Sequence, residues 1–598
     1  MVAGGRGSWG RPTRDMVLVQ QKWQQSPCFP RSQFTLSVNF LKQIQGQRDY
    51  PVWKDELYLK FHRGCYTTHS DQKQANRRSE QLLYSAEFFA TIATLYGGQS
   101  DQGELTQLWQ RILFNQFHDI LPGTSIPEVF VDANQDWAIV AEQAQAILTN
   151  SLKVIAHGLN LPCDGEDLRS TFVVFNDRNW SRSALIELPG SWSSLSTDGG
   201  SARGITQIIQ TRETIKTLVL AEQVPGCGYR TLNLTKIDAP PTPMAELEQH
   251  LPVLENEFLR VEIDPQSGEI KSMVDRGHHR EVLTPGLPQL LAYQDQGQYW
   301  DAWNIDPNYR EHCLGAPQII SWSWQERGPL RQRLRVIKQF QSSHLTQDYI
   351  LETHRPYLEI KTDIDWQETH VLLQAHIHLN FAVTTASYEI PYGVIDRDPT
   401  NPDQWEVPAL HWASVTDGHH GFTLLNDGKY GHSVGPKQIN LSLLRSPTWP
   451  DPHSDRGRHQ FSYFLYPHLG PWQQNSVVHL GHELQRSLSW VKLQPSSNHD
   501  NKSSARSSHG QFFNVGVEGS SLILTALKRS EDRPNQWVIR CYETYGQETQ
   551  LNFASPFGLQ LGDRLNILEQ AIEGQNSIVK PWEIANWHLN PSRGEDLI

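Results

Sequence analysis

LLYSAEFFATIATLYGG, residues Leu82–Gly98, decides the fold class of the first quarter of the chain. Its apolar residues recur three and four positions apart, as on one face of a helix, and the pair Gly97-Gly98 ends the run. Two further runs follow, one closed by Pro122-Gly123 and one opened by Pro127, a residue suited to a first helical turn. Their apolar positions are Leu105, Leu108, Trp109, Ile112 and Leu113, then Phe130, Ala133, Trp137, Val140, Ala144, Ile147, Leu148 and Leu152. The pattern predicts a three-helix bundle within residues 72–157.

After Cys163 the helical spacing ends, and apolar residues occur in short runs in which every second position is apolar. Phe172–Phe175 and Leu259–Ile263 are examples, and the pattern continues to the C-terminus. It predicts stacked antiparallel β-sandwiches, so the fold class expected is α+β with several domains. Asp238–Pro243 is predicted to be a linker, and the polar stretch Ser496–Gly510 a mobile loop. Ahead of the bundle, short helices are expected from Pro12 to Gln25 and from Ser37 to Gln47.

Composition excludes several classes of protein. The 598 residues carry a net charge of −13 without a long basic block, which argues against a nucleic-acid partner. No stretch approaches twenty apolar residues, so no membrane helix is expected, and the N-terminus lacks the apolar core of a signal peptide. The six cysteines are scattered without a close pair, which predicts reduced thiols and a cytoplasmic protein.

The strongest chemical motif is Leu113–Ser125, LFNQFHDILPGTS. Polar residues, among them His118 and Asp119, crowd the end of an otherwise apolar helix, a rigid place to present an imidazole and a carboxylate. His118 is a candidate ligand for a cation and Asp119 a candidate acceptor for sugar hydroxyls. A histidine and a carboxylate satisfied within a helix–loop junction is the alternative, which the pattern alone favours.

A second motif, Asp55–Thr68, has acids at one end, then His-Arg, a glycine and several hydroxyls beside aromatic rings. That mixture suits a carbohydrate site, and an exposed strand and turn is the alternative. Two weaker metal-binding patterns are also present. His482-Glu483 begins a zinc-protease motif, but Arg486 stands in place of the second histidine. His376 and His378 share one face of an expected strand with no third ligand nearby, which favours an ordinary polar sheet face.

Together these two motifs resemble glycoside hydrolase family 38, the α-mannosidases. DELYLKFHRGCYTTH and LWQRILFNQFHDILPGTSI resemble the central region of that family. VVFNDRNW, LENEFLRVEIDPQSGEIKSMVD, EIPYGVIDRDP, GFTLLNDGKYGHSV, LSLLRSPTWPDPHSDRG and IRCYETYGQ resemble its β-domains. These matches follow in order along nearly the whole chain from Pro12, which makes the resemblance specific.

The resemblance implies a retaining exo-α-mannosidase that uses one divalent metal, zinc or cobalt, and acts on α-mannosides and oligosaccharides. By position, His118 is implied as a metal ligand, Asp119, Arg63 and Tyr66 as sugar-binding residues, and Glu56 as the proton-donating carboxylate. The family's His-x-Asp metal pair and nucleophilic aspartate have no match before Pro12, and His69-Ser70-Asp71 lies in the wrong place. The chain is therefore expected to be truncated at its N-terminus and to have weak or no activity alone. The resemblance is also compatible with a homo-oligomer.

The expected domains are a remnant of an N-terminal α/β catalytic domain at 1–55, a helical bundle at 56–160, a small β-domain at 165–240, a β-supersandwich at 245–490 and a C-terminal β-domain at 511–598. A second hypothesis remains at this point: a non-catalytic β-sandwich module that binds glycans or a partner protein. It uses the same β-region, so the sequence separates the two hypotheses poorly.

Overall fold

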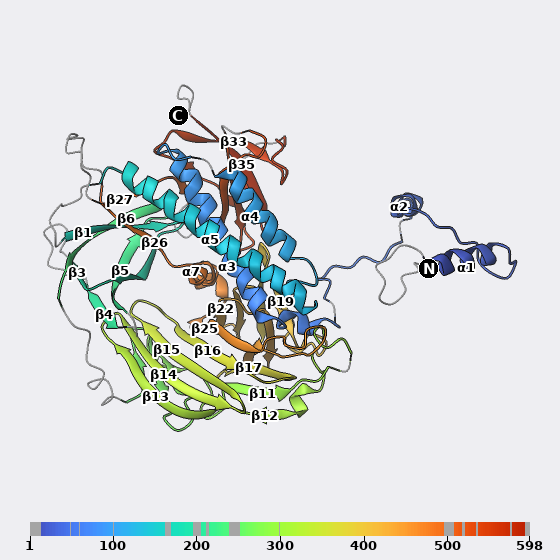
Figure 1. Cartoon of the computed structure of the whole chain (residues 1–598), viewed down its shortest axis with the longest axis horizontal. Coiled ribbons are helices and arrows are strands. Elements are labelled where there is room, and N and C mark those ends of the chain that lie inside the picture. Colours follow the sequence, from blue (N-terminus) through green and yellow to red (C-terminus); the bar gives the residue numbers. More distant parts are fainter. Residues whose placement is uncertain are drawn as a thin grey trace. The chain divides into compact units, whose positions relative to one another are not determined.

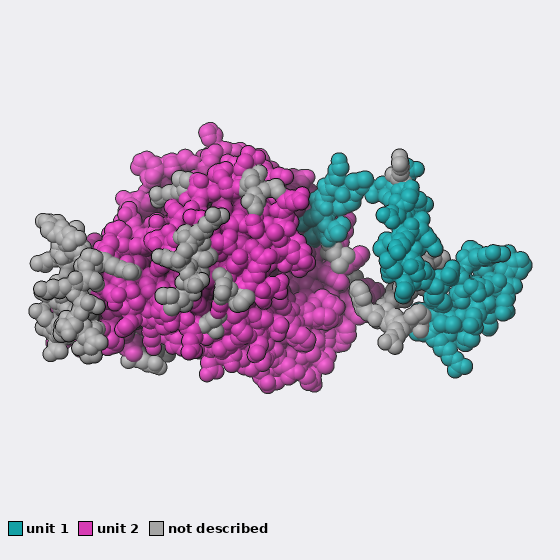
Figure 2. All heavy atoms as spheres, turned by 90° about the horizontal axis from the view of Figure 1, so that it is seen from above, with its two compact units in different colours: residues 1–59 teal, residues 60–598 magenta. Residues whose placement is uncertain are grey.

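A computed structural model gives the arrangement of the chain (Figure 1). It describes residues 13–47, 49–58, 60–99, 101–161, 169–194, 205–210, 214–238, 251–297, 299–494, 507–516, 521–533, 536–573 and 577–591. The chain divides into two compact units, Met1–Leu59 and Lys60–Ile598, which are coloured separately in Figure 2 and described separately below.

The first unit contains two short helices, α1 (Arg14–Gln24) and α2 (Ser37–Ile44). Both lie within the ranges predicted, and the Thr13 side chain caps α1 by accepting a hydrogen bond from the Met16 amide. Neither helix buries a residue. A helix without a packed face gains little stability from tertiary contacts.

The second unit opens with a short 3₁₀ turn, η1 (Arg63–Tyr66), and the three predicted helices: α3 (Ser70–Thr94), α4 (Gln102–Asn115) and α5 (Pro127–Gly158). Pro127 is in the first turn of α5, as expected. Helix α3 packs along α5, and α4 contacts both (Figure 1). The predicted helical face of α3 is buried, with Leu83, Ala86 and Phe89 each at most 1% exposed.

A small β-region follows the bundle. Its strands are β1 (Arg169–Asn176), β2 (Arg182–Pro189), β3 (Trp192–Ser194), β4 (Thr206–Gln210), β5 (Ile215–Val224) and β6 (Gly228–Lys236), completed by β26 (Ser489–Lys492) and β27 (His509–Gln511). They form antiparallel sheets with the orders β26-β1-β6-β27 and β2-β5-β4, and β3 pairs with β6. Two strands from far along the sequence thus join this region.

The largest part of the unit is a set of antiparallel sheets. One has the order β10-β9-β8-β7, one β12-β11-β17-β24-β23-β20, and one β13-β14-β15-β16-β25-β22-β21-β18-β19. The strands of the first two are β7 (Val253–Glu255), β8 (Leu259–Ile263), β9 (Ile270–Asp275), β10 (Arg280–Glu281), β11 (Leu290–Gln294), β12 (Cys313–Gly315), β17 (Val371–His378), β20 (Val407–Pro408), β23 (Gly431–Gly435) and β24 (Gln438–Leu444). Those of the third are β13 (Gln318–Arg327), β14 (Arg331–Phe340), β15 (Ser343–Glu352), β16 (Leu358–Trp366), β18 (Thr385–Ile390), β19 (Gly393–Arg397), β21 (Trp412–Thr416), β22 (His420–Asn426) and β25 (Gly457–Leu469). Short helices η2 (Tyr309–Glu311), η3 (Trp472–Gln474) and α7 (Val477–Gln485) connect them.

Strand β16 shows why these segments form half-buried sheets. Every second residue, from Leu358 through Ile360 and Ile364 to Trp366, is buried, and the residues between them are more exposed. Successive side chains on a strand point to opposite faces, so this alternation places one face against the core.

The C-terminal β-region packs against the helices. Its strands are β28 (Asn514–Val515), β29 (Leu522–Arg529), β30 (Trp537–Glu543), β31 (Thr549–Gln550), β32 (Phe553–Ala554), β33 (Leu559–Leu565), β34 (Ile578–Val579) and β35 (Ile584–Pro591), with the main order β29-β30-β35-β33. One hydrophobic cluster includes Phe89 of α3, Ile155 of α5, Phe175 of β1 and Trp587 of β35. The bundle is therefore held by β-regions that come later in the sequence.

The predicted α+β fold with helices followed by antiparallel β-domains is confirmed. The domain boundaries stay predictions. Residues 239–243 of the predicted linker and 496–506 of the predicted loop lie outside the described residues, whereas the end of that loop forms β27. Within the described residues, no helix is long and apolar enough to cross a membrane.

Candidate functional site

The two chemical motifs meet in the second unit. Lys73, in the first turns of α3, donates hydrogen bonds from Nζ to the carbonyl oxygens of Thr68, Leu121 (3.0 Å) and Pro122 (3.1 Å). Gly123, at φ +81°, lies so close to the turn that an added Cβ would be 2.5 Å from the Thr68 oxygen. A left-handed residue without a side chain is needed there. These contacts bind the loop after α4 to the segment that follows η1.

Electrostatic coupling indicates the same proximity. Burial lowers the pKa of His62, and the Asp119 carboxylate partly opposes that change. Burial raises the pKa of Cys65 to about 11, with Asp119 adding to the rise and Lys73 and Arg445 opposing it. Asp119 thus lies within electrostatic range of the turn that carries Arg63 and Tyr66.

His118 and Asp119 lie just beyond the end of α4. His118 Nε2 is 3.3 Å from Asp119 Oδ2, and the two side chains are 63% and 36% exposed. The other carboxylate oxygen of Asp119 accepts a hydrogen bond of 2.8 Å from the Thr124 hydroxyl, which fixes its orientation. The His118 side chain is thus exposed, and Asp119 is half-buried with contacts to both of its carboxylate oxygens.

Arg63 lies at the start of η1 and is held by the β-supersandwich. Its Nη2 donates to the Asp403 carbonyl oxygen at 2.6 Å, and its guanidinium lies 4.3 Å from the centre of the Trp405 ring. Stacked and hydrogen-bonded in this way, the guanidinium is oriented before any ligand arrives. Tyr66 is half-buried at the other end of η1.

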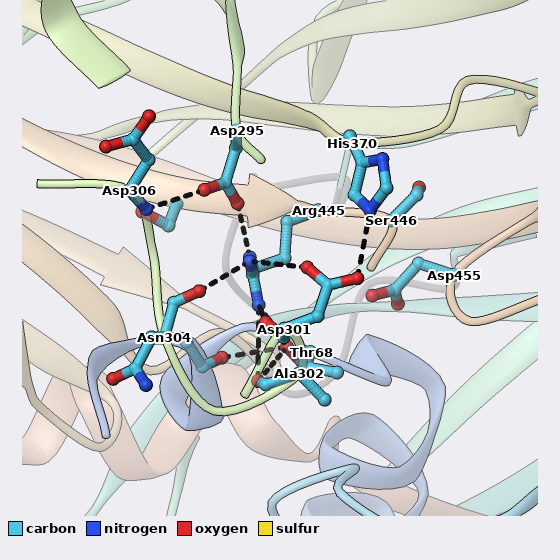
Figure 3. Close-up of polar contacts among 12 residues, drawn as sticks. Thr68, Asp295, Asp301, Ala302, Asn304, Asp306, His370, Arg445, Ser446 and Asp455 are labelled. Atoms are coloured by element: carbon cyan, nitrogen blue, oxygen red, sulfur yellow. Dashed lines mark hydrogen bonds and ion pairs between the residues drawn. The ribbon is translucent and has the colours of Figure 1, made fainter. Parts of the chain in front are cut away.

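A buried polar network lies behind the turn (Figure 3). At its centre is Arg445, which is 0% exposed and pairs with Asp295 through Nε at 2.6 Å. Arg445 also donates to the Thr68 hydroxyl (3.1 Å) and to the carbonyl oxygens of Asp301 (2.8 Å), Ala302 (3.2 Å) and Asn304 (2.8 Å). One side chain thus connects the segment after η1 to a loop of the supersandwich.

His69 has a structural role in the same region. Its Nδ1 is 3.2 Å from Asp71 and its Nε2 is 3.0 Å from Asp451, and its ring stacks on Phe130. Burial alone would lower the pKa of His69, but the Asp451 and Asp71 carboxylates outweigh it and raise that pKa to about 9. A protonated imidazole with both nitrogens occupied cannot bind a metal, which agrees with setting His69-Ser70-Asp71 aside.

The fit to a metal ion is incomplete within this unit. Zinc sites in proteins use three or four ligands, and His118 with Asp119 supplies two donors. Among the residues that the structure describes, no group of three or more His, Cys, Asp and Glu side chains is arranged to hold a metal. His376 and His378 do lie on one face of β17 with ring centres 6.0 Å apart, but His376 is hydrogen-bonded to Tyr293 and burial lowers its pKa to about 3.

Glu56 belongs to the first unit. Its amide donates to the Asp55 carboxylate at 2.8 Å, and its carbonyl oxygen accepts from the Trp53 indole at 3.0 Å. Since the two units are described separately, the structure does not place Glu56 against the other four residues, and its role stays a prediction.

Sequence reasoning missed the contribution of the β-supersandwich. Arg63 is held by Asp403, 340 residues further along the chain, and by the nearby Trp405. Arg445 lies inside a motif that the sequence marks only by its family resemblance. A fully buried arginine has no local sequence signal, because burial depends on the surrounding strands.

Three parts of the chain match known protein families. Residues 60–155 match the family described as "Alpha mannosidase middle domain", residues 254–453 "Glycosyl hydrolases family 38 C-terminal domain", and residues 521–587 "Glycosyl hydrolases family 38 C-terminal beta sandwich domain". Alpha-mannosidase G of Dictyostelium discoideum is 29% identical over 93% of this chain and 53% of its own length. Human alpha-mannosidase 2C1 is 27% identical over 90% of this chain and 50% of its own length. The chain spans about half the length of the curated relatives it matches.

Two solved structures share the fold. One is a protein in glycosyl hydrolase family 38 from Enterococcus faecalis, with a TM-score of 0.75 and 16% identity over 96% of this chain and 76% of the other. The second is an alpha-mannosidase from the same organism, with a TM-score of 0.75 and 15% identity over 96% and 73%. At such identities the likeness concerns the fold alone.

Proposed function

The chain belongs to glycosyl hydrolase family 38, and from that premise we propose that it serves the removal of terminal α-linked mannose by a retaining, metal-dependent exo-α-mannosidase. The observation that carries this proposal is the meeting of the Arg63–Tyr66 turn with the His118–Asp119 pair, held together by Lys73. The substrates proposed are α-mannosides and oligosaccharides. Because the chain spans about half of its curated relatives, the activity of the complete enzyme is part of the proposal.

Each residue has a proposed role. Asp119, oriented by Thr124, accepts hydrogen bonds from mannose hydroxyls, and Arg63 and Tyr66 line the sugar site. His118 supplies one ligand to zinc or cobalt, with the remaining ligands coming from outside the described residues. Glu56 is the candidate proton donor. A retaining mechanism needs two carboxylates about 5 Å apart, one of which attacks the sugar C1. The resemblance assigns only Glu56, so we expect the 598 residues alone to have weak or no activity.

The cellular setting is also proposed. The described cysteines, which are Cys28, Cys65, Cys227, Cys313 and Cys541, are free thiols, and that state suits the reducing cytoplasm. A homo-oligomer is compatible with the family and can be tested by sedimentation.

Hydrolysis of 4-nitrophenyl α-mannoside tests the function. We expect no measurable release by residues 1–598 with or without Zn²⁺ or Co²⁺, because acid catalysis alone supplies only about 10²–10⁴-fold. Fusion to the N-terminal half of a full-length family member should produce turnover. In that fusion, His118→Ala should abolish metal-dependent activity and Asp119→Ala should lower it strongly.

Matched controls in the same helical bundle are His157→Ala and Asp132→Ala, both at exposed positions of α5, and these should keep full turnover. Equal losses in the control variants would remove support for the helix end as the sugar site. Robust turnover by residues 1–598 alone, abolished by Glu56→Gln, would mean that a carboxylate of this chain attacks the sugar.

A further inference from the structure

Three tryptophan rings gather beside the η1 turn, from two separate segments of the supersandwich. The ring centres of Trp300 and Trp449 are 5.6 Å apart, those of Trp303 and Trp449 5.4 Å, and those of Trp300 and Trp303 6.0 Å. Trp300 is 59% exposed and Trp449 49% exposed. These three residues are called the tryptophan platform below. Large exposed aromatic clusters on a folded protein commonly mark a binding site.

The backbone at Trp300 has a left-handed conformation. Trp300 has φ +57°, a left-handed conformation that is rare for a bulky residue and costs about 1–3 kcal/mol. The amides of Trp303 and Asn304 donate to the Trp300 carbonyl oxygen at 2.9 and 3.0 Å and so hold the turn. Such strain persists where surrounding contacts enforce it, as they do in binding sites.

A rigid support lies beneath the platform. Arg445 donates to the carbonyl oxygens of Asp301, Ala302 and Asn304, which are in the loop between Trp300 and the next strand (Figure 3). The Ala302 amide donates to the Trp449 carbonyl oxygen at 3.1 Å and thereby joins the two segments. When the rings are already fixed in place, ligand binding loses little conformational entropy in ordering them.

The platform is continuous with the candidate site. The Gly64 amide donates to the Trp303 carbonyl oxygen at 2.7 Å, and the Thr68 hydroxyl donates to the Ala302 carbonyl oxygen at 2.8 Å. Gly64 lies between Arg63 and Tyr66, so the platform and the proposed sugar-binding turn share backbone contacts.

We propose that the tryptophan platform binds a pyranose ring of an α-linked mannose oligosaccharide, beyond the sugar held at the helix end. The proposal rests on the proposed function for the identity of the sugar. One face of a pyranose carries C–H groups that pack on an indole ring, and hydroxyls at its edge stay in water. The exposed area of Trp300 and Trp449 is roughly 300 Å² at most. That is enough for one or two sugar rings to lie on the platform.

Titration of the full chain with linear α-mannotriose, followed by tryptophan fluorescence and calorimetry in EDTA, tests the proposal without metal or turnover. Trp300→Ala and Trp449→Ala should each weaken binding about tenfold or more. The matched control is Trp582→Ala, because Trp582 is also exposed (43%) and left-handed (φ +61°) but lies between β34 and β35. It should bind as the unaltered chain does. Circular dichroism establishes that each variant is folded, and Trp300→Phe should restore part of the affinity.

Several results would overturn the proposal: no binding of mannotriose by the unaltered chain, equal affinity in Trp300→Ala, or an equal loss in Trp582→Ala. A dimer of the unaltered chain that Trp300→Ala dissociates, with no response to the sugar, would assign the platform to a protein interface instead. A loss in Trp300→Ala alongside normal binding in Asp119→Ala would keep the platform and remove the proposed sugar site at the helix end.

Discussion

Replacement of Arg445 by methionine tests whether one buried side chain holds the site together. The ion pair with Asp295 has both partners at most 1% exposed and a separation of 2.6 Å. At that distance and an effective dielectric constant of about 20, the attraction is about 6 kcal/mol before desolvation is subtracted. Removal of one partner of a buried pair costs about 3–5 kcal/mol, because the other charge stays buried and unpaired. Arg445→Met also leaves the carbonyl oxygens of Asp301, Ala302 and Asn304 without this donor.

A chain of several domains does not unfold in one step, so the loss should be measured locally. Hydrogen exchange followed by mass spectrometry reports the opening of the segments 62–68 and 299–306. A loss of about 3–5 kcal/mol in the free energy of opening should speed exchange there by roughly 10²-fold to 5 × 10³-fold. Peptides from β29 and β30 should exchange as before, because these strands belong to the C-terminal β-region and not to the sheets around Arg445.

Arg458→Met is the matched control. Arg458 pairs with Asp363 at 2.5 Å, but its side chain is 69% exposed, and water and salt screen such pairs. It should leave exchange unchanged in both segments. The double variant Arg445→Met with Asp295→Leu should recover part of the loss, because no charge is then left unpaired. Unchanged exchange at 299–306 in Arg445→Met, or the same acceleration in Arg458→Met, would refute the assigned role of Arg445.

Three further predictions follow from the same region. The pKa of His69 is raised from 6.5 to about 9, so its stabilising contribution is complete below pH 6.5 and is lost as the pH rises through 9. The difference in the free energy of local opening at residues 62–73 between the unaltered chain and His69→Gln, measured by hydrogen exchange, should shrink over that window, and a constant difference would contradict the assignment. Gly123→Ala should lower the local free energy of opening by at least about 2 kcal/mol more than Gly97→Ala does, because both positions are left-handed but only Gly123 would place its Cβ 2.5 Å from another residue. Equal hydrogen exchange of residues 62–68 in the two variants would exclude the close packing of the loop on the turn. After dialysis, elemental analysis should find less than one zinc per chain, since His118 and Asp119 offer fewer than the three or four ligands of a stable site. One tightly held zinc that His118→Ala removes would show that the chain has further ligands.

Local pattern was sufficient for the helices and the general course of the strands. The apolar spacing of Leu82–Ala93 and Pro127 at a helix start predicted α3 and α5, because helical periodicity depends only on residues three and four apart. The candidate pair His118–Asp119 could also be found from the sequence, since the two residues are neighbours at a predicted helix end. The exposure of the two side chains and their contacts with each other and with Thr124 came only from the structure.

Tertiary structure alone decided how the site is assembled. The hydrogen bond from Arg63 to Asp403 joins residues 340 positions apart, and the one from Arg445 to Thr68 joins residues 377 positions apart. Trp300 and Trp449 are likewise brought into contact only by the packing of the loop before η2 against the loop after β24. The sequence by itself determined the local elements and the family resemblance, because both are written in neighbouring residues. The burial of Arg445, the orientation of Arg63 and the gathering of three tryptophans depend on which strands pair across the sheets, and no short stretch of sequence carries that information.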